Sequence, residues 1–371
     1  MRIPLIFKLV ILLLMPVFAS SQFLKYSNEF LNIGAGARGL GMGSSQAASV
    51  SDGTAGYWNP AALVGVQNNP SVNIMHASYF DNIGIYDFAS VAIPVDDNKR
   101  VLGLTALRFA VDDIPNTLFL VEPDGSINYG NITTFSSADY AFLFSFAQKI
   151  KDDDDFKTSF GANAKIIYRK VGQFATAWGF GFDAAFKLQK DRWSLGIVAK
   201  DVTTTFNAWS FHFTQEEQQV LYLTENEIPV KSTELTAPHL TVGTSYNFRL
   251  GSSVNLLTEA DFDLTFDGER NTVIGSNTVS VDPHAGIEAS IKKVFFVRAG
   301  ISNFQRALAD GDTTNQKKVW IYQPSLGAGF KINNVSIDYA FTNLANQSNP
   351  LYTNVFSLKI DLVKNKKVSK K

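Results

Sequence analysis

Strict alternation between large apolar residues and small or polar residues constrains the fold of this chain more than any other feature of its sequence. In residues 139–148, for example, Tyr140, Phe142, Phe144 and Phe146 fall on one face of an extended chain. Successive side chains of a β-strand point to opposite faces, so this pattern predicts strands with two chemically different sides. Similar alternation recurs in segments from residue 139 to residue 361.

The length of the alternating segments favours membrane strands. They run for about ten to fourteen residues, whereas strands of a soluble β-sandwich, which also alternate, have typically about five or six. Their second face is small or charged, which suits a polar lumen better than a dry core. We therefore predict an all-β fold, a closed antiparallel transmembrane β-barrel of about fourteen strands. The candidate strands are 71–80, 85–95, 100–111, 136–149, 157–170, 175–189, 192–202, 236–250, 252–266, 281–292, 294–305, 318–331, 334–345 and 350–361.

The connections between these strands alternate in length. Long connections fall at 112–135, 203–235, 267–280 and 306–317, and most of the intervening ones are short turns. Outer-membrane barrels have long extracellular loops and short periplasmic turns, so this alternation supports a barrel and an outer-membrane location.

Composition excludes several classes of protein. The formal net charge of −1 gives no reason to expect nucleic-acid binding. A mean hydropathy near zero excludes a helical membrane bundle. It does not exclude a barrel, because the hydropathies of the alternating apolar and polar residues of a barrel strand cancel in the mean. The chain has no cysteine, which excludes disulfides, thiolate metal sites and lipoprotein acylation.

The two ends of the chain differ from its centre. Arg2, Lys8, the apolar run 9–15 and the small residues Ala19 to Ser21 predict a signal peptide over residues 1–21. Residues 22–70 do not alternate and form a predicted hatch, residues 71–361 form the predicted barrel, and residues 362–371 form a predicted basic periplasmic tail.

The predicted hatch is rich in Gly, Ala and Ser. Small residues suit a segment that threads a lumen, because its backbone must pack closely against inward side chains. Gly34, Gly36 and Gly39 have the spacing of a dinucleotide-binding fingerprint, but no strand–helix unit surrounds them, and the chain is predicted to be exported. The residues of the hatch motif are Gly34, Gly36, Gly39, Gly41, Gly43, Trp58, Asn59, Pro60 and Ala61.

This opening resembles that of the PorV/PorQ family, which belongs to the FadL-like outer-membrane barrel superfamily of Bacteroidota. Residues 58–61 resemble the Asn-Pro-Ala element of that superfamily, where the hatch meets the first strand. Residues 113–117 and 135–142 are also similar to PorV/PorQ relatives. The resemblance implies a barrel of about fourteen strands with an N-terminal hatch. The chain departs from many outer-membrane barrels in ending on a basic tail rather than on an aromatic residue.

No pattern of catalytic or metal-binding residues emerges. The four histidines lack metal-ligand spacing, and no nucleophile elbow is present. The charged residues on the inward face have mixed signs, which predicts ion pairs and hatch contacts in the lumen rather than a selectivity ring. We therefore predict neither an enzyme nor a cofactor.

The connection 203–235 carries aromatic and helical signals. Trp209, Phe211 and Phe213 precede a Thr-Gln-Glu-Glu capping box, which predicts a short helix through about residue 224 that includes Leu221 and Tyr222. A free extracellular loop would not expose such apolar residues. The helix is interpreted as a lid over the barrel mouth or as a docking surface for a protein or a hydrophobic ligand.

Two functions are compatible with these features. The resemblance implies a non-enzymatic accessory or plug-type component of the type 9 protein secretion translocon. The alternative is a FadL-like outer-membrane transporter for hydrophobic small molecules, which requires an apolar pocket of about 300–1,000 Å³. A lumen filled by the hatch and ion pairs would instead favour secretion, and a purely structural role in an envelope complex is a third hypothesis. The predicted partners are outer-membrane lipids, the large type 9 translocon barrel, and a hydrophobic ligand or detergent in the lumen, with no nucleic acid.

Overall fold

The computed structural model describes residues 27–80, 82–122, 124–153, 155–228, 231–308, 318–343 and 352–362. The predicted signal peptide and nearly all of the predicted basic tail lie outside these ranges.

Sixteen strand segments form one antiparallel sheet in the described part of the chain. The segments are β1 Ser71–Tyr79, β2 Gly84–Val95, β3 Arg100–Asn116, β4 Thr133–Asp152, β5 Lys157–Val171, β6 Ala175–Lys190, β7 Trp193–Lys200, β8 Thr205–Phe211, β9 Lys231–Thr236, β10 His239–Leu250, β11 Val254–Thr265, β12 Ser280–Ile291, β13 Phe295–Leu308, β14 Lys318–Ile332, β15 Val335–Thr342 and β16 Thr353–Asp361.

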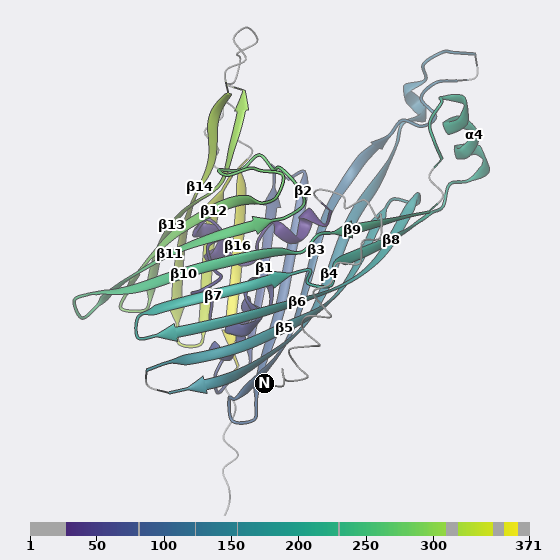
Figure 1. The fold of residues 1–371 in the computed structure, drawn as a ribbon. Coiled ribbons are helices and arrows are strands. Elements are labelled where there is room, and N and C mark those ends of the chain that lie inside the picture. Colours follow the sequence, from purple (N-terminus) through teal and green to yellow (C-terminus); the bar gives the residue numbers. More distant parts are fainter. Residues whose placement is uncertain are drawn as a thin grey trace, which may run out of the picture.

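The sheet closes on itself. β1 pairs with β16, in register from Ser71↔Asp361 to Ser78↔Asn354, and β5 pairs with β6. The first part of β6 pairs with β8, and its last part pairs with β7. On their other sides, β8 pairs with β9 and β7 pairs with β10. β7 and β8 are thus two segments of one wall strand, and β9 and β10 are two segments of the next. The described segments form a closed barrel of fourteen wall strands, which confirms the predicted fold class (Figure 1).

The two faces of the wall have the predicted chemistry. Outward side chains such as Phe144, Trp178 and Phe356 are 52%, 53% and 57% exposed, although they are large and apolar. Inward side chains such as Lys165 and Arg298 are buried. An apolar exterior around a polar interior is the arrangement of an outer-membrane barrel.

Residues 27–70, the lumenal segment, pack against the inward face of the wall. The segment contains the short helices η1 Glu29–Asn32, α2 Ala37–Gly41, α3 Ala55–Trp58 and η2 Pro60–Gly65. Figure 1 shows these helices in purple within the ring of strands. Most of the segment is buried, and its large apolar residues, such as Phe30, Leu40 and Leu63, pack in clusters shared with the wall. Its own secondary structure is therefore held mainly by the surrounding barrel.

No helix among the described residues has the length and apolar character needed to cross a membrane.

The prediction for residues 203–235 was incomplete. This connection contains β8 and β9 on either side of α4 Gln215–Leu223, and the strand expected from residue 236 begins at His239. β8 carries aromatic residues on both faces and β9 is mostly polar, so neither shows a clear period-2 contrast. The remaining predicted strands correspond to observed ones, with ends that differ by a few residues.

Candidate functional site

Two carboxylates of β11 hold one turn of the lumenal segment by its backbone. Asp261 Oδ2 accepts the amide hydrogens of Gln46 and Ala47 at 2.8 and 2.9 Å. Glu259 Oε1 accepts those of Ala48 and Ser49 at 2.7 and 3.1 Å. Four consecutive amides of the segment are thereby satisfied by side chains of the wall, which anchors this turn.

A chain of ion pairs joins the lumenal segment to the wall further round the barrel. Arg38 Nε lies 2.9 Å from Glu288 Oε2 on β12, and Arg298 Nε on β13 lies 2.6 Å from the same atom. Arg298 Nη1 also lies 2.6 Å from Asp338 Oδ1 on β15. Burial tends to lower the pKa of Arg38, but the Glu288 carboxylate outweighs it and the pKa rises overall. The mixed inward charges thus form ion pairs, as predicted.

The residues of the predicted hatch motif come together. Trp58 Nε1 donates to Ala35 O at 2.8 Å, and Asn59 Nδ2 donates to Ala47 O at 2.6 Å. Asn59 Oδ1 accepts the Ala61 amide at 3.0 Å and caps η2, in which Pro60 occupies the first turn. Asn59 therefore links the start of η2 to the turn held by β11. The glycines of the motif, Gly34, Gly36, Gly39, Gly41 and Gly43, are all buried.

Several wall glycines, among them Gly300 and Gly196, permit close approach of the lumenal backbone. A Cβ at Gly300 on β13 would collide with the backbone of Met42 and Gly43, and one at Gly196 on β7 would collide with the backbone of Ala47. Any larger residue would therefore displace the segment.

Tyr57 ties the beginning of the segment to its middle. Its hydroxyl donates to Leu31 O at 2.6 Å and accepts the Gly34 amide at 2.8 Å. Burial raises the pKa of this phenol well above its usual range, so it stays protonated and keeps the donated hydrogen bond.

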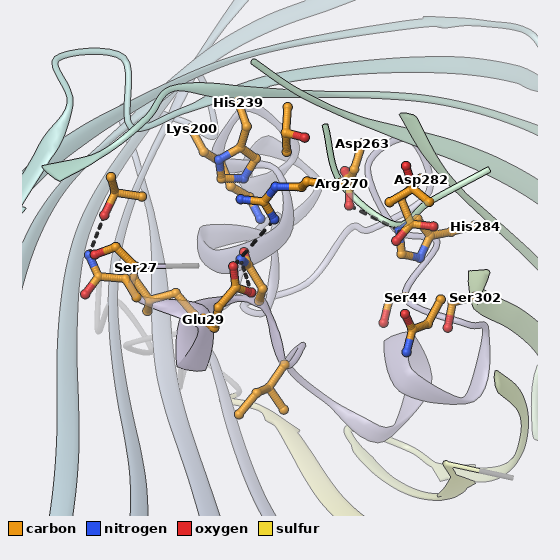
Figure 2. Close-up of a pocket in the computed structure, with 18 of the residues that line it drawn as sticks. Ser27, Glu29, Ser44, Lys200, His239, Asp263, Arg270, Asp282, His284 and Ser302 are labelled. Atoms are coloured by element: carbon orange, nitrogen blue, oxygen red, sulfur yellow. Dashed lines mark hydrogen bonds and ion pairs between the residues drawn. The ribbon is translucent and has the colours of Figure 1, made fainter. Parts of the chain in front are cut away.

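A polar chamber of about 540 Å³ lies on the long-loop side of the lumenal segment. Figure 2 shows Lys200 and His239 on one side of it and Asp263, Asp282 and His284 on the other. His284 Nε2 lies 3.2 Å from Asp263 Oδ2, and His284 Nδ1 lies 3.1 Å from Gly43 O. The chamber has charges of both signs, so it suits water or a polar group better than a hydrocarbon.

The breaks in two wall strands lie beside this chamber. Lys165 Nζ on β5 lies 2.8 Å from Asp183 Oδ1 and 2.5 Å from Asp201 Oδ1, where β7 ends. The three side chains are only 4%, 5% and 7% exposed. The neighbouring strand breaks at Ala237 and Pro238, which line the chamber. The buried ionic triad therefore satisfies polar groups where strand pairing is interrupted.

An apolar pocket of about 500 Å³, here called the apolar chamber, lies on the inward face of the extended strands β3, β5, β6 and β8 and is broadly open on one side. Trp209 and Phe211 on β8 have near-parallel rings 6.3 Å apart, and Phe211 and Phe213 have near-parallel rings 6.4 Å apart. Phe174, in the turn between β5 and β6, lies 5.8 Å from the Phe213 ring. Leu118, Val171, Ala175, Asn116, Ser232 and Glu234 complete the lining.

An ionic group lies at the base of the apolar chamber. Arg169 on β5 pairs with Asp139 on β4 at 2.9 Å and with Glu234 on β9 at 3.2 Å. Its guanidinium carbon also lies 5.1 Å from the centre of the Trp209 ring. Glu234 lies 3.5 Å from the Ser27 hydroxyl, which lines the polar chamber. The ionic group therefore separates the two chambers.

The predicted capping box and helix are present. Thr214 Oγ1 accepts the Glu217 amide at 3.2 Å, and Glu217 Oε2 accepts the Thr214 amide at 2.8 Å. Glu217 Oε1 also accepts from Gln173 Nε2 at 2.7 Å, which fastens α4 to the β5–β6 turn.

The predicted site residues of this connection separate into two groups. Trp209, Phe211 and Phe213 line the apolar chamber, whereas Leu221 and Tyr222 line neither chamber. Tyr222 is 77% exposed, and α4 stands at the far end of the extended strands (Figure 1). A lid or docking role for α4 stays a prediction.

Sequence patterns missed several residues of both chambers. Phe174, Leu118 and Glu234 come from three separate connections or strand ends, and nothing in their spacing links them. His239 and His284 lie on inward faces near the long-loop ends of their strands, which alternation could have indicated. Among the described residues, no cluster of three or more His, Cys, Asp or Glu is arranged to hold a metal ion.

The barrel resembles solved structures of outer-membrane channels. It superposes on the "CymD monoaromatic hydrocarbon channel" with a TM-score of 0.54 and 13% identity, covering 90% of this chain and 98% of that one. It superposes on the Ralstonia pickettii toluene transporter TbuX with a TM-score of 0.53 and 13% identity, covering 89% and 99%. It superposes on the Pseudomonas putida toluene transporter TodX with a TM-score of 0.53 and 12% identity, covering 89% and 98%.

This chain shares the fold of these hydrocarbon channels. These three neighbours are described as a hydrocarbon channel and toluene transporters. No family model matches the sequence, and no curated protein matches it either.

Proposed function

We propose that this barrel takes up a hydrophobic small molecule across the outer membrane. The observation that carries the proposal is the apolar chamber, an open, aromatic-lined pocket of about 500 Å³ on the inward face of the wall. Its volume falls within the range of about 300–1,000 Å³ that small-molecule sites occupy. The similar structures are described as transporters or channels for toluene and other monoaromatic hydrocarbons.

The lining of the chamber favours a planar or short aliphatic solute. The near-parallel rings of Trp209, Phe211 and Phe213 present extended apolar surface, and transfer of a solute from water to such surface is favourable. The Arg169–Glu234 pair places charged groups at the base of the chamber, on the side of the polar chamber. The solute therefore binds in the aromatic part before any step that moves it further.

Transport also requires movement of the lumenal segment. The segment is hydrogen-bonded to β11 and ion-paired to β12, so the bore is occupied in this conformation. Release of a solute towards the periplasm needs at least a local displacement of these contacts. Binding and passage are therefore separate steps that separate variants can distinguish.

Equilibrium binding tests the proposal. The full-length protein, held in amphipol, is titrated with the fluorescent hydrophobic probe N-phenyl-1-naphthylamine, and toluene is added as a competitor. Phe211→Asp places a charge in the chamber and should weaken probe binding about ten-fold or more. Phe206→Ala is the matched control, because Phe206 lies on the same strand, is 42% exposed and does not line the chamber. Equal binding by wild type and Phe211→Asp would reject this site.

A second proposal is the accessory role in type 9 secretion that the resemblance to the PorV/PorQ family implies. The filled lumen supports it, since a plug needs a closed bore. Purification in mild detergent from its native host should then retain the large translocon barrel with the wild-type protein and with Phe211→Asp. Absence of that barrel from the wild-type preparation would reject this role.

A further inference from the structure

One row of outward side chains crosses six adjacent strands in register. The sheet pairs these residues successively from β1 to β6, so they form a continuous line on the outside of the wall. In order they are His76, Asp87, Arg108, Tyr140, Tyr168 and Trp178.

This row marks a change in the chemistry of the outer surface. On the short-turn side of it, the outward residues are apolar, for example Ile74 on β1, Leu104 on β3 and Phe142 on β4, which are 47%, 42% and 39% exposed. Tyr and Trp favour the level of lipid headgroups, because their rings are apolar and their tips polar. The row therefore lies at a membrane–water interface.

The interface is the outer one. β3 runs from Arg100 through Arg108 to Asn116 and then enters the long connection 117–132. Long connections face the outside of the cell in outer-membrane barrels. The row is therefore at the level of the headgroups of the outer leaflet.

Three ionisable residues occupy the part of the row on β1, β2 and β3. Asp87 Oδ1 lies 2.8 Å from His76 Nδ1, and Asp87 Oδ2 lies 3.3 Å from Arg108 Nη1. Their side chains are 62%, 42% and 37% exposed for His76, Asp87 and Arg108 respectively. Ile83, in the β1–β2 turn beyond them, is 58% exposed and apolar. The charges thus have apolar surface on both sides along the wall.

The partners of Arg108 do not use all of its hydrogen-bond donors. Arginine has five N–H donors in a planar fork; Asp87 accepts from Nη1 of Arg108, and the Tyr140 side chain is a second partner of this guanidinium. Asp87 contacts His76 through Nδ1, so Nε2 of the exposed ring faces the surroundings. An imidazole that donates through Nδ1 has a second donor at Nε2 only when it is doubly protonated, so the donors left for a ligand are those of Arg108. A phosphate, which accepts paired hydrogen bonds from arginine, matches these donors.

We propose that His76, Asp87 and Arg108 form a binding site for the phosphate of an outer-leaflet lipid headgroup. Arg108 contacts the phosphate, Asp87 positions the guanidinium, and His76 holds the other oxygen of the Asp87 carboxylate. Tyr140, the next residue in the row, supplies an amphipathic ring beside the sugar or glycerol portion of the headgroup. The site is independent of the proposed transport function, because it lies on the opposite face of the wall from both chambers.

Native mass spectrometry of the full-length protein in detergent tests this site, with diphosphoryl lipid A as the probe. The wild-type protein should bind lipid A, and Arg108→Gln should weaken that binding about ten-fold or more. Arg108→Lys keeps the charge but loses the planar fork, so its affinity should fall between the two. Arg192→Gln, in the exposed β6–β7 turn, removes an equal charge at the other end of the barrel and should leave binding unchanged.

Two further probes distinguish the source of the phosphate. Lipid A without its phosphates should bind the wild-type protein no more tightly than diphosphoryl lipid A binds the Arg108→Gln variant. Inorganic phosphate at millimolar concentration should not displace lipid A, because the acyl chains and the wall contribute to binding. Equal affinity for phosphorylated and dephosphorylated lipid, full affinity in Arg108→Gln, or displacement by inorganic phosphate alone would overturn the assignment.

Discussion

Arg38 of the lumenal segment and Glu288 of β12 form a bidentate ion pair. Arg38 Nε lies 2.9 Å from Oε2, and Arg38 Nη2 lies 3.3 Å from Oε1. The side chains are 23% and 11% exposed, so water screens the pair only weakly. Together with the amides held by β11, this pair decides whether the lumenal segment stays in place.

Arg38→Met should destabilise the barrel by about 2 kcal/mol, because it removes charge-assisted hydrogen bonds from a buried carboxylate. Arg298 still pairs with Glu288 in this variant, so the loss of stability should be smaller than that caused by a buried carboxylate without any partner. Urea unfolding of the detergent-solubilised protein, followed by tryptophan fluorescence, measures the change. Arg100→Met is the control, since Arg100 pairs with Asp96 at a site about half exposed, and should cost less than about 1 kcal/mol. Equal losses in the two variants would show that the Arg38 pair has no special role.

Gly300→Val should open the bore. The new side chain would collide with the backbone of Met42 and Gly43, so this part of the lumenal segment must move away from β13. Single-channel recording in planar bilayers should show a higher conductance for Gly300→Val than for the wild-type protein. Ala299→Val, at the adjacent position, points to the opposite face of the strand and should conduct like wild type. Unchanged conductance in Gly300→Val would contradict close packing at this position.

Thr214→Ala should loosen α4 without unfolding the barrel. The substitution removes the capping box and weakens the helix by about 0.5–2 kcal/mol. Limited proteolysis should therefore cleave residues 215–228 faster in this variant, while the barrel keeps its resistance. Glu216→Ala, in the same helical turn but outside the box, is the control. Equal cleavage rates in Thr214→Ala and wild type would mean that other contacts hold the helix.

Alternation predicted the barrel because most wall strands from β4 onward carry their own evidence. Residues such as Phe142 and Lys165 differ in chemistry and point to opposite faces, so their orientation follows from neighbours in sequence alone. β8 and β9 escaped prediction because they lack this contrast. Their position also depends on the breaks at Asp201 and Pro238, which no local pattern specifies.

The candidate site was predicted only in part. Trp209, Phe211 and Phe213 occupy every second position along β8 and just beyond its end, so the sequence alone indicates that they share one face. Phe174 and Leu118 meet them only because the barrel brings separate connections together. The charged residues of the lumen were identified as inward, but the pairing of Arg298 with both Glu288 and Asp338 depends on strand register. The PorV/PorQ resemblance and the secretion role stay predictions.

Uptake by intact cells tests the central claim, that the barrel admits hydrophobic solutes through the apolar chamber. N-phenyl-1-naphthylamine becomes fluorescent when it crosses the outer membrane of a Gram-negative host, and the initial rate is compared at equal barrel content. Wild-type protein and Phe206→Ala should raise this rate above that of cells without the barrel, and Phe211→Asp should return it to the background. A wild-type rate equal to the background, or an undiminished rate with Phe211→Asp, would contradict the account.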